Sequence, residues 1–270
     1  MRVRANCYLT PLLAAVAGAL VIPGLAWAGS GGSGTGGAGT GPASPGSSQH
    51  PPVPVTSGNV PVSASSDGIT ITTEASAFIR GGVSVSGSVP ASDSGDTVEI
   101  DQLSSNATAT WGPVAYTSAQ PGGSFAAAWH PSRAGQLTIR AVIQGGQASS
   151  AAAAPTLSLT VYRRSKATLY GPGFWGHRTA CGVILRRRTI GVANRTLPCG
   201  TQVQLYYKGR VITVAVIDRG PYAHGANWDL TMATGRALGA LTTVVIGAAA
   251  APAASTGSAQ PPATAAAAAR

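Results

Sequence analysis

Two carboxylate side chains in the last third of this 270-residue chain could take part in chemistry. Asp218 directly follows residues 211–217, a nearly continuous apolar run that is typical of a strand buried on both faces. A carboxyl group at the end of such a strand suits general acid/base work because burial raises its pKa, although the adjacent Arg219 acts in the opposite direction. Asp218 is therefore a candidate for acid/base chemistry. The alternative is that its carboxylate holds the fold together.

The second acid, Asp229, is assigned a structural role. Residues 229–239 have the apolar spacing of one short helix, and Gly239 can end it. An Asp at the first position suits an N-cap, whose side chain accepts hydrogen bonds from the free backbone N–H groups of the first turn.

Several aromatic and polar residues near Asp218 are candidates for binding a ligand, since an exposed aromatic face offers a flat apolar surface. We expect Trp175 and Trp228 to form an exposed pair, because each lies in a polar or glycine-rich stretch. The alternative is that half or more of the aromatic residues belong to a core. The substrate-binding candidates are Tyr170, Trp175, Asn194, Arg219, Tyr222 and Trp228.

The cysteines indicate an oxidising compartment. Cys7 lies in a leader sequence, which leaves Cys181 and Cys199, an even number. A disulfide between them closes a short loop and contributes about 3 kcal/mol of stability. A metal site and a reactive thiol are the other interpretations, and neither is favoured without a convergent set of His and Cys ligands. We expect no metal and no cofactor.

The leader, residues 1–28, has the features of a signal peptide. Arg2 and Arg4 precede an apolar run that is too short to span a bilayer comfortably, and the sequence Ala-Trp-Ala at residues 26–28 is a cleavage site. An uncleaved anchor is the alternative. After cleavage we expect no stable membrane span and an extracytoplasmic location. Residues 29–66 are mostly Gly, Ser, Pro and Thr, a composition that predicts a disordered linker.

Short strands are predicted from residue 67 to residue 162, and we assign this segment to an immunoglobulin-like β-sandwich spacer. Alternating runs occur at residues 69–72, 83–89, 97–100, 137–143 and 157–162. Trp111, Phe125 and Trp129 are the expected core aromatics. The acids at positions 93, 96, 99 and 101 suggest either solvated turns, which we favour, or a calcium site.

The segment 163–246 is strongly basic, with 12 Lys and Arg against two acids. Strands are predicted at residues 203–207 and 211–217, joined by a tight turn at Lys208 and Gly209, with a last strand at 242–246. Residues 247–270 read as a disordered Ala/Pro tail. Charge alone would allow a nucleic-acid partner, but export favours an anionic cell envelope, and no nucleic acid is expected.

Five motifs in this segment, taken together and in this order, resemble the RlpA-like (rare lipoprotein A) double-psi β-barrel family. They are Tyr170-Gly171-Pro172-Gly173, Arg178-Thr179-Ala180-Cys181-Gly182, Arg195-Thr196-Leu197-Pro198-Cys199-Gly200-Thr201, Asp218-Arg219-Gly220-Pro221-Tyr222 and Asp229-Leu230-Thr231. The two cysteines are similar to a variant found in actinobacterial secreted proteins, and there is a more distant likeness to expansin and barwin barrels.

The resemblance implies an all-β chain, in which a six-stranded double-psi β-barrel with one or two short helices follows the sandwich. It also implies a secreted cell-wall protein that binds peptidoglycan glycan strands, with anionic wall polymers as a further expected partner. Some family members are lytic transglycosylases, lyases that form 1,6-anhydromuramic ends, and one carboxyl group, here Asp218, can serve both proton transfers. A non-catalytic, expansin-like binding or wall-loosening module is the alternative.

Two positions depart from the family pattern. Val183 stands where Glu is common, and Asn194 stands where a His assists the catalytic Asp. Asn194 can hydrogen-bond a sugar but cannot exchange protons near neutral pH. His177 and His224 are possible substitutes, although exposed loop positions are the more expected reading of both. These departures favour the binding module, whereas Asp218 favours the enzyme.

Overall fold

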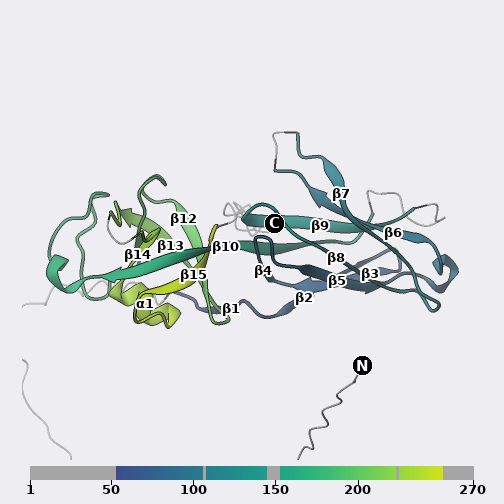
Figure 1. The fold of residues 1–270 in the computed structure, drawn as a ribbon, viewed down its shortest axis with the longest axis horizontal. Helices are drawn as coiled ribbons and strands as arrows, with labels where there is room; N and C mark the ends of the chain where they lie inside the picture. Colours follow the sequence, from purple (N-terminus) through teal and green to yellow (C-terminus); the bar gives the residue numbers. More distant parts are fainter. Residues whose placement is uncertain (1–52, 106–107, 145–152, 223–224, 252–270) are drawn as a thin grey trace, which may run out of the picture. The chain divides into compact units, whose positions relative to one another are not determined.

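The computed structural model describes residues 53–105, 108–144, 153–222 and 225–251, and their regular secondary structure is almost entirely β-strand (Figure 1). The predicted signal peptide, most of the predicted linker and most of the predicted tail lie outside the described residues. Within the described ranges, no helix has the length and apolar character needed to cross a membrane.

The first half of the described chain forms two antiparallel sheets that enclose one apolar core. The first sheet has the order β2-β3-β5-β8, made of Pro61–Ser66, Ile69–Glu74, Val83–Ser88 and Ser124–Trp129. The second contains β7 (Trp111–Ser118), β6 (Thr97–Leu103), β9 (Gly135–Gln144) and the start of β10 (Thr156–Tyr170), and β4 (Ser76–Phe78) pairs with β10 in parallel. This is the predicted β-sandwich architecture; its immunoglobulin-like character stays a prediction.

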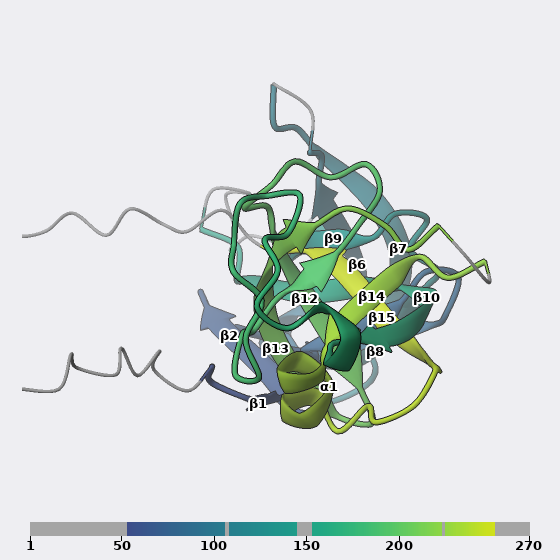
Figure 2. The ribbon, with the colours of Figure 1, turned by 90° about the vertical axis from the view of Figure 1, so that its left-hand side faces the viewer.

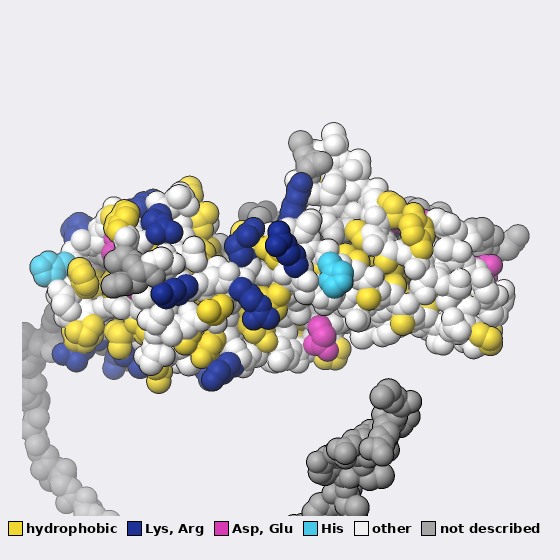
Figure 3. All heavy atoms as spheres, viewed as in Figure 1, with side chains coloured by type: hydrophobic (Ala, Val, Ile, Leu, Met, Phe, Trp, Pro, Cys, Tyr) yellow, Lys and Arg dark blue, Asp and Glu magenta, His cyan; other side chains and the backbone are white. Residues whose placement is uncertain are grey.

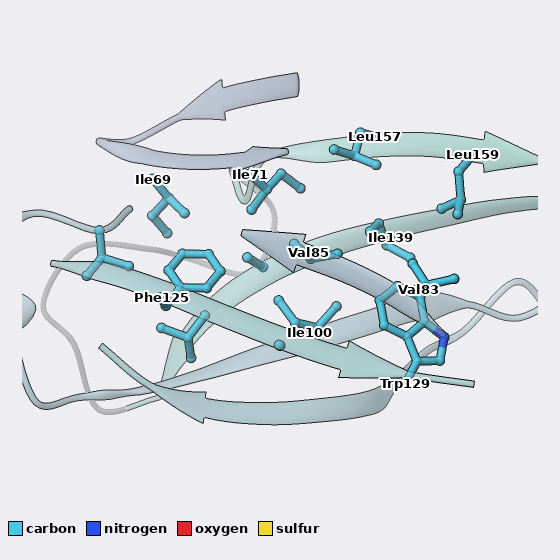
Figure 4. Close-up of a cluster of buried hydrophobic side chains, with 14 of the residues drawn as sticks. Ile69, Ile71, Val83, Val85, Ile100, Phe125, Trp129, Ile139, Leu157 and Leu159 are labelled. Carbon is cyan, nitrogen blue, oxygen red and sulfur yellow. The ribbon is translucent and has the colours of Figure 1, made fainter. Parts of the chain in front are cut away.

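Alternation of side chains builds the sandwich core (Figure 4). Val83 and Val85 of β5 are buried while the intervening serines are exposed, as a period of two requires. Phe125 and Trp129 are buried, as expected. Trp111 is only half-buried, since it lies at an edge strand where the Arg140 guanidinium stacks 4.4 Å from its ring centroid.

Strand β10 runs without a break across the domain boundary predicted at residues 162/163. Its first half pairs with β9, and its second half pairs with β14 (Trp228–Thr231) and β15 (Val244–Ala250). Leu157 belongs to the sandwich core and Ala167 to the barrel core, and the alternation of buried and exposed residues is interrupted between them, where Tyr162 is buried and Arg163 is exposed. Continuous backbone pairing therefore makes one strand where the sequence suggests two.

Six strands close into a barrel in the order β10-β15-β12-β13-β11-β14, and the β14–β10 pairing completes the ring (Figure 2). The new members are β11 (Val192–Ala193), β12 (Gln202–Tyr207) and β13 (Arg210–Asp218). Lys208 and Gly209 both have positive φ, which fits the tight hairpin predicted between β12 and β13. The predicted six-stranded barrel is thus confirmed.

The helix is shorter than predicted and begins later. It is α1 (Met232–Leu238), and Thr231 is its N-cap, accepting a hydrogen bond from the backbone N–H of Thr234 at 3.1 Å. Asp229 lies in β14 instead, so its assignment as the cap is wrong. The reason is tertiary: Trp228 and Leu230 alternate into the barrel core, which holds these residues as a strand. Gly239 ends the helix in a left-handed conformation, as predicted.

Both ends of the predicted domains differ from the structure. Residues 53–66, assigned to the linker, include β2 and also β1 (Thr56–Ser57), which pairs with the start of β13. Backbone pairing and a 2.6 Å hydrogen bond from the Tyr206 hydroxyl to Asn59 Oδ1 hold this segment, although it has few large apolar side chains. At the other end, β15 continues to Ala250, past the predicted limit at 246, because its small residues pair with β12.

Candidate functional site

Four residues form a row across four neighbouring strands at one end of the barrel. Thr168 of β10 pairs with Asp229 of β14, Asp229 pairs with Ala193 of β11, and Ala193 pairs with Asp218 of β13. Directly opposed residues project from the same face of a sheet. Asp218 and Asp229 therefore lie on two strands that have only β11 between them. Their backbones are about 10 Å apart.

A β-bulge sets the position of Asp218. The register between β11 and β13 shifts between Val192 and Ala193, so that Val192 pairs with Val216 while Ala193 pairs with Asp218. The extra residue, Ile217, is buried. An additional residue re-aims the side chains that follow it, and here it brings Asp218 onto the row that contains Asp229.

A cavity of about 580 Å³ opens over this row. All four residues of the row line it, and the small side chain of Ala193 leaves space between the acids. Of the residues predicted to bind substrate, Tyr170, Arg219 and Tyr222 also line it.

The Asp218 carboxylate is anchored on one oxygen. Oδ1 accepts hydrogen bonds from the backbone N–H of Ala180 at 2.9 Å and of Arg219 at 2.8 Å. Oδ2 accepts none from the residues that the structure describes. The side chain is half-buried in the wall of an open cavity, so it is not sealed in a cage. Such an arrangement fixes the carboxylate and leaves its second oxygen for a ligand.

Asp229 is half-buried and accepts a hydrogen bond from the Thr168 hydroxyl at 2.9 Å. Burial raises the pKa of its carboxyl group, and the nearby charge of Asp218 raises it further, while the Thr168 hydrogen bond acts in the opposite direction. The structure thus gives this cavity a second acid that the sequence analysis assigned to a cap. The signal that could have identified it is the alternation of Trp228 and Leu230 around it.

Tyr170 brings a buried hydroxyl group to the same place. The residue is 9% exposed, and its oxygen finds no hydrogen-bond partner within the described ranges. Burial raises its pKa, with further contributions from Asp218 and Asp229, so the phenol stays protonated. It can donate one hydrogen bond to a ligand or to a carboxylate that moves towards it.

The exposed aromatic residues are not the predicted pair. Trp228 is 7% exposed and packs in the barrel core, which corrects its assignment as a sugar-binding surface. Trp175 is half-buried under the Arg187 guanidinium and does not line the cavity. Tyr222 is 79% exposed and lines the cavity, as does Phe174, which was not among the chosen residues and is 59% exposed.

The side-chain amide of Asn194 makes hydrogen bonds with backbone groups of loop residues. Its Oδ1 accepts hydrogen bonds from the backbone N–H groups of Thr196 and Leu197 at 3.0 and 2.9 Å, and its Nδ2 donates to the Asn227 carbonyl at 3.3 Å. It does not line the cavity. The Arg219 guanidinium donates to the Asn194 carbonyl at 3.3 Å, so this Arg links the loop to the end of β13.

Cys181 and Cys199 form the predicted disulfide, with a Cα–Cα distance of 5.6 Å. Cys181 follows Ala180, whose N–H holds Asp218, and the Arg219 guanidinium lies 3.3 Å from the Cys199 sulfur. The disulfide therefore joins the two loops that border the catalytic candidate.

Among the described residues, no histidine and no further acid lines this cavity. His177 is exposed and does not line it, and His224 lies outside the described residues. Across the described ranges, no group of three or more His, Cys, Asp and Glu side chains is arranged to hold a metal ion, including the sandwich acids considered for calcium.

The closed barrel and its acidic cavity define an RlpA-like double-psi β-barrel domain, as the motifs indicated. Residues 163–250 match a family model described as lytic transglycolase. This match covers the barrel, and the sandwich lies outside it.

Curated relatives match the same part of the chain. A "Probable endolytic peptidoglycan transglycosylase RlpA" of Aquifex aeolicus is 39% identical over 87 residues, 32% of this chain and 38% of the relative. One of Synechocystis sp. is 41% identical over 75 residues, 27% of this chain and 23% of the relative. The chain thus spans well under half the length of these relatives. Among solved structures, the Streptomyces papain inhibitor is 28% identical, with a TM-score of 0.28, over 33% of this chain and 93% of that chain.

Proposed function

We propose that this protein is a secreted cell-wall enzyme that binds peptidoglycan glycan strands and cleaves them as an endolytic transglycosylase. The observation that carries the proposal is the placement of Asp218 and Asp229 in one open cavity, in environments that differ. The names of the relatives point to the same reaction. A leader sequence and a disulfide between Cys181 and Cys199 fit a location outside the cytoplasm.

The two carboxyl groups divide the proton transfers. Asp229, whose pKa is raised by burial, holds a proton at the cavity wall and donates it to the glycosidic oxygen as the bond to the anomeric carbon breaks. Asp218, with one oxygen fixed by two N–H groups, faces the positive charge that develops on the sugar. Its free Oδ2 then accepts the proton of the C6 hydroxyl, whose oxygen bonds to the anomeric carbon. The products are a 1,6-anhydro end and a free hydroxyl end, with no water consumed.

This division differs from a mechanism in which Asp218 performs both transfers alone. A pair of carboxyl groups with different environments is the usual basis for separate acid and base roles. The pair also provides two proton carriers, whereas Asn194, at the position of the family's assisting His, cannot act as one.

The other cavity residues suit glycan binding. Tyr222 and Phe174 offer exposed rings at the cavity wall, and Tyr170 offers a hydroxyl donor beside the acids. Arg219 lines the same wall and carries a charge that can meet the carboxylate of a muramic acid.

The experiment is digestion of glycan strands stripped of stem peptides, with 1,6-anhydromuramic ends measured by mass spectrometry. Asp218→Asn and Asp229→Asn should each lower the yield at least about 100-fold, the usual range for loss of acid/base catalysis, while binding is kept. Asp67→Asn, an exposed acid of the sandwich, is the matched control and should leave the yield unchanged. Full activity in Asp229→Asn, with none in Asp218→Asn, would return both transfers to Asp218.

A binding module without turnover is the second candidate, and one observation favours it. The Asn194 amide, at the position of the family's assisting His, is committed to three loop contacts and cannot relay a proton. Strand binding by the wild type without any anhydro product, under conditions in which an active transglycosylase yields it, would establish this function instead.

A further inference from the structure

A second, smaller cavity lies on the outer surface of the barrel. Its volume is about 180 Å³, and its walls combine aromatic rings with cations. Arg164 stacks on the ring of Phe78 at 4.3 Å, and the Lys208 ammonium lies 5.4 Å from the centroid of Tyr207. Tyr206 and Val245, 58% exposed, complete the wall.

The two cavities lie on one face of the same pair of strands. Residues 164, 166, 168 and 170 of β10 alternate to the outside of the barrel, opposite the core residue Ala167. Arg164 pairs with Gly247 and Lys166 with Val245 on β15. Thr168 and Thr243 lie one step further, and both line the acidic cavity. Thr168 lies four residue steps along β10 from Arg164, a distance of about 13 Å.

The face between the cavities is basic. Lys166 is exposed between the cavities, and Arg164 and Lys208 are exposed at the second cavity. The two acids of the barrel, Asp218 and Asp229, lie at its far end in the first cavity. Figure 3 shows the wider pattern, with Lys and Arg far more common than Asp and Glu on the visible barrel surface.

We propose that the outer face of β10 and β15 is an extended binding track, on which a glycan strand held in the acidic cavity continues and places its free carboxylates against Arg164 and Lys208. The track rests on the proposed function and adds to it a second contact region, which recognises free lactyl carboxylates of the same strand. Phe78 supports this role because a stacked guanidinium is already held in place for a bidentate contact. The rings of Tyr206 and Tyr207 supply apolar faces for the sugars beside it.

Gly247 lines this cavity, and its lack of a side chain leaves room for the neighbouring aromatic rings. A Cβ at that position would meet the Tyr162 Cβ at 2.8 Å and the Phe78 Cε1 at 3.0 Å, so a side chain cannot be added without displacing the rings. The second cavity therefore depends on the packing of Phe78 and Tyr162 against β15. The ring centroids of these two residues are 5.9 Å apart.

The test is calorimetric binding of the full chain carrying Asp218→Asn, which removes turnover from the readout. The ligands are peptide-free glycan strands and the same strands with their carboxyl groups amidated. Adding Arg164→Gln and Lys208→Gln together should weaken binding of the acidic strands about three- to tenfold, as expected for two exposed ion pairs, and reduce its salt dependence. Binding of the amidated strands should not change.

Arg188→Gln is the matched control, since Arg188 is an exposed cation of the barrel outside both cavities. If Arg188→Gln weakens binding of the acidic strands equally, the attraction is a general effect of charge and not of the track. If the double variant binds the acidic strands as before, the track is contradicted. Stronger competition by a polyol-phosphate polymer than by the acidic glycan would overturn the choice of ligand. The proposed enzymatic function is tested separately from the track. If the wild type binds strands through Arg164 and Lys208 but never cleaves them, the track is supported and the transglycosylase activity is contradicted.

Discussion

Asp218 and Asp229 reach one cavity from strands β13 and β14, and both pair with the same residue, Ala193 of β11. This relationship makes a two-acid site from motifs that lie apart in the sequence. It also gives the two groups different surroundings, since Asp218 is held by two backbone N–H donors and Asp229 by one hydroxyl group.

The pH dependence follows from the raised pKa of Asp229. Because the proton donor must be protonated, turnover should fall as pH rises through this pKa. The free energy of unfolding should change with pH in the same direction. Because the pKa of Asp229 is higher in the folded state than in the unfolded state, its contribution to stability is complete below about pH 4 and is lost as pH rises through the folded-state pKa. Asp229→Asn should remove this dependence in thermal unfolding measured across that window. A carboxyl titration by NMR with an unshifted Asp229 would contradict the assignment.

Ala193 should tolerate little change in size. Ala193→Leu would fill the space between the acids, and we expect loss of glycan binding together with about 1–3 kcal/mol of destabilisation from overpacking. Ala193→Ser keeps the volume nearly constant and is the control for the substitution itself. Calorimetric binding and thermal unfolding of both variants are the measurements. Tight binding by a folded Ala193→Leu protein would show that the substrate does not enter between the carboxylates.

Tyr170→Phe should separate binding from folding. The phenol oxygen is buried and finds no partner in the described part of the chain, so its removal should leave the free energy of unfolding unchanged or raise it. If the hydroxyl donates to the glycan, the Kd should rise about three- to tenfold, the value of one hydrogen bond. Urea unfolding and calorimetry measure the two effects. Equal affinity in the variant would restrict Tyr170 to packing.

The disulfide should affect both stability and the position of Asp218. Replacing Cys181 and Cys199 by Ala should cost about 3 kcal/mol, measured by chemical denaturation. It should also lower kcat, because the N–H that holds Asp218 belongs to Ala180, the neighbour of Cys181. Unchanged kcat in the double variant, at a temperature where it is folded, would show that the loop keeps its place without the bond.

Local patterns were enough to predict much of the barrel. Alternating runs, the Lys208–Gly209 turn and the two cysteines that follow the predicted leader predicted β12, β13, their hairpin and the Cys181–Cys199 bond, because each depends on neighbouring residues or on simple pairing. The placement of Asp218 at the end of a buried strand was visible for the same reason. The resemblance of five motifs then supplied the closed topology.

The partners of each strand were decided only by tertiary structure. Asp229 precedes a helical pattern in the sequence, but parallel pairing with β10 makes it a strand residue and turns it to the cavity. Trp228 occupies a polar stretch yet fills the core, because its face of β14 is the inner one. A bulge at Ile217 and the small Ala193 bring the two acids together across β11. Burial and pairing across strands are not local properties, so the sequence determined which groups could do the chemistry, and barrel closure determined which of them meet.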